Sequence, residues 1–182
     1  MKIETLALQG KPNLNNNMAA SVAATMFEFR KDTLKKSFQT FQKTEHRLEF
    51  VVKVHGISFW NDSKATNVNS TWYALESMKT PIIWIAGGTD KGNEYDCLFE
   101  LVKNKVKALI CLGADNSKLI EIFSPYVEVI ADTHSMEEAV NAAYQLGNPG
   151  DVVLLSPACA SFDLFENYED RGTQFKNAIR EL

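Results

Sequence analysis

Four short apolar runs mark the second half of the chain, and polar residues do not alternate within them. They are Ile82–Ala86, Ala108–Leu112, Val127–Ile130 and Val152–Leu155. A strand with one face in solvent alternates apolar and polar side chains, whereas a strand buried on both faces is apolar throughout. The pattern therefore predicts four strands inside a sheet that is covered on both sides.

Apolar residues at helical spacing lie between and after these runs. One helical face is shared by Val68, Trp72 and Leu75, a second by Met136, Ala139, Val140 and Ala143, and a third by Phe175, Ala178, Ile179 and Leu182. Strands that alternate with helices are joined by right-handed crossovers and form a parallel sheet. We predict an α/β fold: a Rossmann-like, mostly parallel sheet with helices on both faces.

A hairpin is predicted at the start of this α/β region. The β-prone runs Leu48–Val54 and Ile57–Trp60 flank the dipeptide His55-Gly56. Two such runs joined by a two-residue turn are typical of antiparallel strands.

The first 45 residues have a different character. Ile3–Leu8 predicts a short strand, Asn13–Phe29 a helix rich in Ala and Met, and Asp32–Phe41 a second helix capped by the aspartate. So few residues cannot bury a core alone. We therefore predict that residues 1–45 are the tail of another domain and that residues 46–182 form the α/β domain.

Composition narrows the class of protein. Of the 182 residues, 45% are hydrophobic and 23% are charged, and the net charge of -4 is spread along the chain. No basic face points to nucleic acid, and no apolar segment reaches the roughly 18 residues of a membrane span. Three widely spaced cysteines and three histidines without ligand spacing favour neither a disulfide framework nor a metal site. We expect a cytoplasmic monomer that binds neither nucleic acid nor membrane.

Three polar loops follow predicted strands, at the edge of the sheet where such folds bind ligands. The first loop is Asn61–Asn67. It can simply cap the next helix through Thr66 or Asn67, or it can bind a polar ligand through Asp62, Lys64 and Thr66.

The second loop, Gly87–Gly92, lacks the Gly-Lys-Ser/Thr sequence of a P-loop, and Thr89 occupies the second glycine position of a dinucleotide fingerprint. It is either a plain glycine-rich turn or a ligand site with Lys91 as its cation. The third loop, Ser156–Asp163, consists largely of small residues that leave room for a ligand, and Ser161 offers a hydroxyl. We expect Cys159 to be a small buried residue rather than a nucleophile.

Taken together, these loops resemble the Mur ligase family, and within it the members that add D-glutamate. The resemblance rests on His46–Glu49, Asn61–Asn67, Ala86–Gly88 with Lys91-Gly92, and Leu154–Asp163, and it continues through Phe165, Asn167–Glu169 and Arg171-Gly172. It implies the last of three domains, which delivers the amino acid, preceded by the end of a central ATP-binding domain. It further implies a ligase of peptidoglycan synthesis, acting in cell-wall formation, cell shape and cell division.

The resemblance implies a reaction in which ATP, with magnesium, phosphorylates the carboxylate of UDP-N-acetylmuramoyl-L-alanine. The amine of D-glutamate then attacks the acyl phosphate. Matched by motif, Thr66 and Lys91 would hold the α-carboxylate of D-glutamate, and Ser161 and the backbone amide of Tyr168 its side-chain carboxylate. Two anionic groups of one small molecule would thus meet a cation, hydroxyls and an amide.

The same resemblance implies nucleotide contacts. Asp62 would contact the ribose, Lys64 and Arg47 would lie near the phosphates, and Asn16 would lie near the adenine. The chain departs from the family near its start, where Pro12 stands in place of a histidine and removes an imidazole and a backbone N–H. No catalytic residue and no metal ligand can be named, and we expect this chain alone to bind neither ATP nor magnesium and to have no ligase turnover.

Two alternatives stay open at this point. One is a relative that adds another amino acid, such as a diaminopimelate- or lysine-adding ligase or a folylpolyglutamate synthetase; the Asp-Asn-Pro-Arg sequence usual in the diaminopimelate enzymes does not occur here. The residues do not exclude L-glutamate as the added amino acid either. The other alternative is a Rossmann-like binding module without catalysis.

Overall fold

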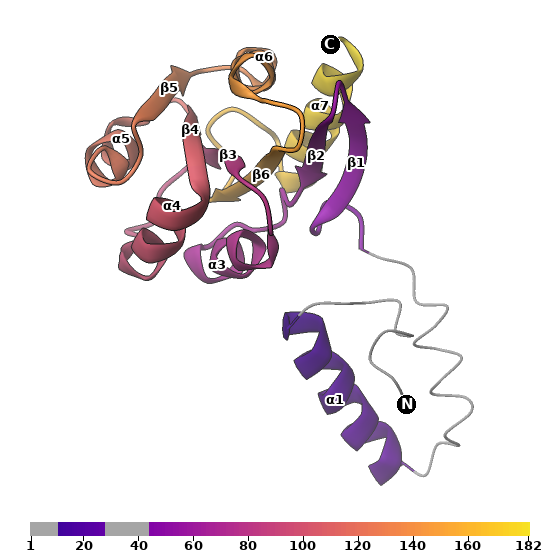
Figure 1. Ribbon diagram of the computed structural model, residues 1–182. Helices are drawn as coiled ribbons and strands as arrows, with labels where there is room; N and C mark the ends of the chain where they lie inside the picture. Colours follow the sequence, from indigo (N-terminus) through magenta and orange to yellow (C-terminus); the bar gives the residue numbers. More distant parts are fainter. Residues whose placement is uncertain (1–10, 28–43) are drawn as a thin grey trace. The chain divides into compact units, whose positions relative to one another are not determined.

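The computed structural model describes residues 11–27 and 44–182 (Figure 1). The chain divides into two compact units, Met1–Glu45 and His46–Leu182. In the first unit the described element is helix α1 (Lys11–Met26), which confirms the helix predicted there. The predicted strand Ile3–Leu8 and helix Asp32–Phe41 lie outside the described residues.

The second unit is built on a six-stranded sheet. Its strands are β1 (Glu49–Val54), β2 (Ile57–Asn61), β3 (Ile82–Gly87), β4 (Val106–Leu112), β5 (Val129–Thr133) and β6 (Val152–Ala158). They lie in the order β1-β2-β6-β3-β4-β5, and all neighbours are parallel except β1 and β2. The mostly parallel sheet is therefore confirmed. Strand β5 begins two residues later than predicted, because the Val127 amide donates to the Phe123 carbonyl and closes the preceding turn.

The predicted hairpin forms, with Val54 paired to Ile57. Its two turn residues, His55 and Gly56, have φ angles of 45° and 89°. Positive φ at both central positions is the geometry whose twist matches two antiparallel strands. The hairpin adds an antiparallel edge to the parallel sheet.

Helices cover both faces of the sheet (Figure 1). They are α3 (Val68–Ser77), α4 (Phe99–Lys105) and α5 (Ser117–Phe123) on one face, and α6 (Met136–Leu146) and α7 (Tyr168–Arg180) on the other. A 3-10 turn, η2 (Asp96–Leu98), precedes α4. The helical faces predicted from sequence correspond to α3, α6 and α7. Sequence spacing missed η2, α4 and α5, since two turns are too short for a periodic signal. No helix in the described ranges has the length and apolar character needed to cross a bilayer.

The core consists of two apolar layers, one on each face of the sheet. Along β3, Trp84 faces the layer under α3, α4 and α5, whereas Ile83 and Ile85 face the layer under α6 and α7. All residues of β3 are buried. Burying such a side chain stabilises the fold by about 1.5–3 kcal/mol. The prediction of strands buried on both faces is confirmed for β3, β4 and β6. It is wrong for β5, an edge strand on which only Thr133 is buried.

The chain reverses its direction across the sheet between β3 and β6. From β3 it moves outward to β4 and β5 through α4 and α5 on one face, and it returns through α6 on the other face to β6, beside β3. Ligands of open α/β sheets bind outside the carboxyl ends of the strands at such a reversal. The second and third loops begin there.

Candidate functional site

The second and third loops are joined directly at the carboxyl edge of the sheet. The Thr89 amide donates to the Ala160 carbonyl across 2.9 Å. Gly88, with φ of 121°, lies so close that a Cβ there would be 2.1 Å from the same carbonyl oxygen. The close approach therefore requires glycine at this position. Ala158 also has a positive φ, of 60°, where the chain leaves β6.

A buried arginine binds all three loops together. Arg171 of α7 is 1% exposed. Its guanidinium donates to the hydroxyl and the carbonyl of Ser63 in the first loop, at 3.0 and 2.9 Å. It also donates to the carbonyls of Gly87, at 3.4 Å, and Cys159, at 3.3 and 3.2 Å. Burial lowers the pKa of Arg171 to about 10, so the group remains a cation at neutral pH and its donors stay aimed at the three loops.

The first and third loops also meet at Asp62, which is 6% exposed. Its carboxylate accepts the Ser156 hydroxyl at 2.9 Å and the Leu48 amide at 3.0 Å. Burial raises the pKa of Asp62 to about 6, although these two donors and the nearby Arg47 act in the opposite direction. A buried carboxylate at a loop edge can accept hydrogen bonds from a ligand hydroxyl, as a ribose contact requires.

The four residues matched to D-glutamate come from all three loops and the start of α7. Ser161 is 2% exposed, and the Lys91 ammonium lies 5.9 Å from the ring centroid of its neighbour, Phe162. The structure thus brings Lys91 beside the loop that carries Ser161. Tyr168 is the first residue of α7, where backbone amides lack helical partners. Thr66 is exposed in the first loop, and the capping role falls to Asn67, whose side chain accepts the Ser70 amide.

The residues matched to the nucleotide are divided between the two units. The Lys64 ammonium donates to the Tyr168 hydroxyl at 3.1 Å, so the first loop contacts the start of α7. Arg47 is exposed, one residue before the Leu48 amide that binds Asp62. Asn16 belongs to α1 in the other unit, and its side chain lies outside the described residues.

Sequence reasoning missed the structural roles of Arg171 and Asp90. Asp90 accepts the amides of Gly92 and Asn93 and pairs with Lys118 at 2.9 Å. A signal for Arg171 was present, because it lies four residues before Phe175 on the apolar face of α7. A charged residue at a core position indicates a polar partner in the interior. Cys159 is buried, as expected, and so is Cys111; burial raises the pKa of both thiols.

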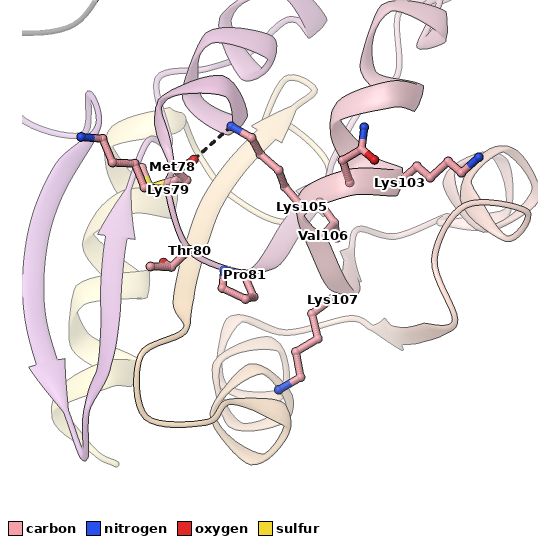
Figure 2. Close-up of a pocket in the computed structure, with 9 residues that line it drawn as sticks. Met78, Lys79, Thr80, Pro81, Lys103, Lys105, Val106 and Lys107 are labelled. Carbon is pink, nitrogen blue, oxygen red and sulfur yellow. Dashed lines mark hydrogen bonds between the residues drawn. The ribbon is translucent and has the colours of Figure 1, made fainter.

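The opposite edge of the sheet contains a cavity of about 480 Å³, at the amino ends of β3 and β4. It is lined by Met78, Lys79, Thr80, Pro81, Lys103, Asn104, Lys105, Val106 and Lys107. Figure 2 shows that the ammonium groups of Lys79, Lys103 and Lys107 point away from one another. Lys105 instead donates to three carbonyls at the end of α3. This arrangement does not converge on an anion, so the cavity is not the candidate site.

Sequence comparisons identify the relatives of this chain. The family profile described as Mur ligase, glutamate ligase domain, matches residues 46–159. UDP-N-acetylmuramoylalanine–D-glutamate ligase of Christiangramia forsetii is 58% identical over the whole chain, which covers 41% of that protein. The enzyme of the same name from Porphyromonas gingivalis is 53% identical, again over the whole chain and 40% of its own length. The chain thus spans about two fifths of these curated relatives.

Solved structures share the fold at low identity. UDP-N-acetylmuramate-alanine ligase MurC of Thermotoga maritima superposes with a TM-score of 0.69 at 14% identity, over 97% of this chain and 39% of that one. MurF of the same organism, solved with ADP, has a TM-score of 0.59 at 14% identity, over 88% and 36%. The profile match over well over half of the chain shows that this chain belongs to the Mur ligase family and contains its glutamate ligase domain.

Proposed function

We propose that the protein carrying this chain is an ATP-dependent ligase that joins D-glutamate to UDP-N-acetylmuramoyl-L-alanine. The observation that carries the proposal is the identity of 58% and 53%, over the full chain, with two enzymes named for that reaction. The geometry of the carboxyl edge supports it, because the Lys91 ammonium lies 5.9 Å from the ring centroid of Phe162, the neighbour of the buried Ser161.

In the proposed mechanism, this chain's residues position the nucleophile. Lys91 and Thr66 hold the α-carboxylate of D-glutamate, while Ser161 and the Tyr168 amide hold the side-chain carboxylate. The two ends so fixed leave the amine facing the acyl phosphate, and holding the reactants in a reactive geometry supplies much of the rate. Asp62, Arg47 and Lys64 contact the nucleotide that phosphorylates the other substrate.

The remaining parts of the reaction belong, in this proposal, to the part of the enzyme outside this chain. We assign residues 1–45 to the end of the central ATP-binding domain and residues 46–182 to the domain that delivers the amino acid. The 182 residues contain no P-loop sequence, so we place the phosphate-binding loop and the magnesium ion in that remainder. ATP and UDP-linked precursors are cytoplasmic, and we propose a cytoplasmic monomer that binds no nucleic acid.

The test uses the full-length enzyme with UDP-N-acetylmuramoyl-L-alanine, ATP and a panel of D-glutamate, L-glutamate, L-lysine and meso-diaminopimelate. We expect product with D-glutamate alone. Replacing Lys91 with Ala removes a charge-assisted contact of about 1.5–3 kcal/mol and should lower kcat/KM for D-glutamate about ten- to hundredfold.

Lys79→Ala is the matched control, since Lys79 is an exposed lysine at the opposite edge of the sheet. It should leave kcat/KM for D-glutamate unchanged. Incorporation of another amino acid in place of D-glutamate would overturn the proposed substrate. Equal behaviour of Lys91→Ala and the wild-type enzyme would overturn the proposed role of Lys91.

A further inference from the structure

We propose that Asp90 and Tyr95 are positioning residues that set where Lys91 lies relative to Ser161, and so determine the affinity for the amino-acid substrate. This inference rests on the proposed function. It concerns residues that neither the sequence motifs nor the resemblance singled out.

The Asp90 carboxylate fixes the backbone on the carboxyl side of Lys91. One oxygen accepts the Gly92 amide at 2.6 Å and the Asn93 amide at 2.9 Å. The chain therefore folds around this carboxylate, with Lys91 at the outside of the turn. On the amino side, the Thr89 amide is held by the Ala160 carbonyl. Lys91 is thus flanked by anchored residues in both directions.

The second oxygen of Asp90 connects this turn to other elements. It accepts the Tyr95 hydroxyl at 2.8 Å and pairs with the Lys118 ammonium of α5 at 2.9 Å. Lys118 also donates to the Asn93 carbonyl and lies 5.5 Å from the centroid of the Tyr95 ring. Burial acts to raise the pKa of Asp90. The hydrogen bonds that its carboxylate accepts have the larger combined effect and hold the pKa below its ordinary value; the donors are the Asn93 amide, Lys118, Tyr95 and the Gly92 amide.

Tyr95 and Asn93 carry the connection to the third loop. Tyr95 is 2% exposed, and its hydroxyl lies 3.3 Å from the Cys159 sulfur. The Asn93 side-chain amide donates to the Ala158 carbonyl at 3.2 Å. These contacts end two residues before Ser161. A continuous set of polar contacts therefore joins the turn that presents Lys91 to the segment that presents Ser161.

Lys91 needs such support because its own side chain is exposed. A lysine ammonium is a point charge on a four-carbon stem, and ordering that stem costs up to about 2 kcal/mol of rotamer entropy. When the backbone of Lys91 is already held in place, only its side chain loses conformational entropy on binding. If the turn loosens, the ammonium samples positions away from Ser161, and one small dicarboxylate can no longer meet both groups.

The test is a double-mutant cycle in the full-length enzyme, with steady-state constants measured for all three substrates. Asp90→Asn keeps the shape of the side chain but replaces the charged carboxylate, which accepts from Tyr95 and pairs with Lys118, by a neutral amide. We expect KM for D-glutamate to rise about five- to tenfold, with kcat and the other two KM values changed less than about twofold. Tyr95→Phe keeps the buried ring and should raise the same KM about two- to fivefold.

The double-mutant cycle distinguishes a positioning role of Asp90 from a general loss of enzyme activity. If Asp90 acts through Lys91, Asp90→Asn should change KM for D-glutamate by less than about twofold in the Lys91→Ala background. Asp96→Asn is the matched control, because it makes the same chemical change at an exposed residue of η2 and should change nothing. If Asp90→Asn does not fold, Tyr95→Phe replaces it in the double-mutant cycle with Lys91→Ala.

Two results would overturn the inference while leaving the proposed function intact. One is an equal rise in all three KM values, and the other is a D-glutamate effect of Asp90→Asn that persists in the Lys91→Ala background. In both cases Lys91→Ala alone still weakens D-glutamate use. If Lys91→Ala has no effect, the proposed role of Lys91 fails, and the inference fails with it.

Discussion

The two edges of the sheet both present lysines, and they differ in where those lysines point. At the carboxyl edge, Lys64 and Lys91 lie against Tyr168 and Phe162, residues of the segment that follows β6. At the amino edge, Lys79, Lys103 and Lys107 surround a cavity of about 480 Å³ and diverge from it (Figure 2). The ammonium groups around this cavity therefore do not converge.

Hydrogen bonds between loops, rather than the volume of a cavity, therefore distinguish the carboxyl edge as the candidate site. Arg171 joins the carboxyl-edge loops through buried polar contacts, and Asp90 is connected to the third loop through the hydroxyl of Tyr95. At the amino edge, Lys105 donates to carbonyls at the end of α3 and Lys107 pairs with Asp151, so each lysine joins two elements. These contacts stabilise the fold without bringing the ammonium groups together.

Removing the Arg171 guanidinium should have the largest effect on stability, because it takes away the contacts that distinguish the carboxyl edge from the amino edge. Arg171→Met leaves five buried acceptor contacts unmade. We expect the free energy of unfolding of the 182-residue chain, from urea titration, to fall by about 3–5 kcal/mol. Arg180→Met, at an exposed position of the same helix, should change it by less than about 0.5 kcal/mol. Similar losses in both variants would show that Arg171 does not hold the loops.

The pH dependence of stability should reveal the buried carboxyl of Asp62. Its folded pKa of about 6, raised by burial from 3.8, means that the folded chain keeps a proton that the unfolded chain releases. Its contribution is therefore complete below about pH 4 and is lost as pH rises through 6, a change of up to about 3 kcal/mol.

Urea titrations of the wild-type chain and of Asp62→Asn between pH 4 and 7.5 measure this contribution. The wild type should lose stability over that range relative to the variant, which cannot release a proton there. Asp115→Asn, at an exposed position, should follow the wild-type curve. Parallel curves for the wild type and Asp62→Asn would contradict the raised pKa.

Substitution of Lys105 should have the smallest effect on stability, and it tests whether the amino edge influences the candidate site. Its ammonium donates to the carbonyls of Leu75, Glu76 and Met78, at 3.1, 2.7 and 3.0 Å. Lys105→Met should reduce the free energy of unfolding by about 1–2 kcal/mol through loss of these helix-end contacts. In the full-length enzyme it should leave KM for D-glutamate unchanged. A raised KM would mean that the amino edge communicates with the site. Lys103→Met, exposed beside it, is the control for charge alone.

Much of the fold could be predicted because the central strands β3, β4 and β6 are buried on both faces. That burial appears in the sequence as apolar runs. The ends of two of these runs indicated the second and third loops, and the end of the hairpin indicated the first. The helices α4 and α5 escaped prediction, since seven residues give less than two full periods of a helical pattern. The hairpin was visible because its turn needs two residues with positive φ, and His55-Gly56 allows this.

The candidate site could be predicted as a set of side chains but not as a connected structure. Lys91 and Ser161 stand out as a cation and a hydroxyl in loops after strands. The contact between Tyr95 and Cys159 joins residues 64 positions apart, and no local pattern reports it. The acceptors of Arg171 are mostly backbone carbonyls, which every residue carries, so no pairing of side chains marks them.

That choice of acceptors has a consequence for redesign. Of the five hydrogen bonds from the Arg171 guanidinium, four end on main-chain oxygens of Ser63, Gly87 and Cys159. A main-chain oxygen remains when the side chain beside it is exchanged, as at Ser63 and Cys159, whereas Gly87 must stay glycine because a Cβ there would lie 2.3 Å from the Leu112 carbonyl oxygen. Side chains of the first and third loops can therefore be exchanged while the Arg171 contacts between the loops are kept, which makes this domain a scaffold for redesigned ligand contacts.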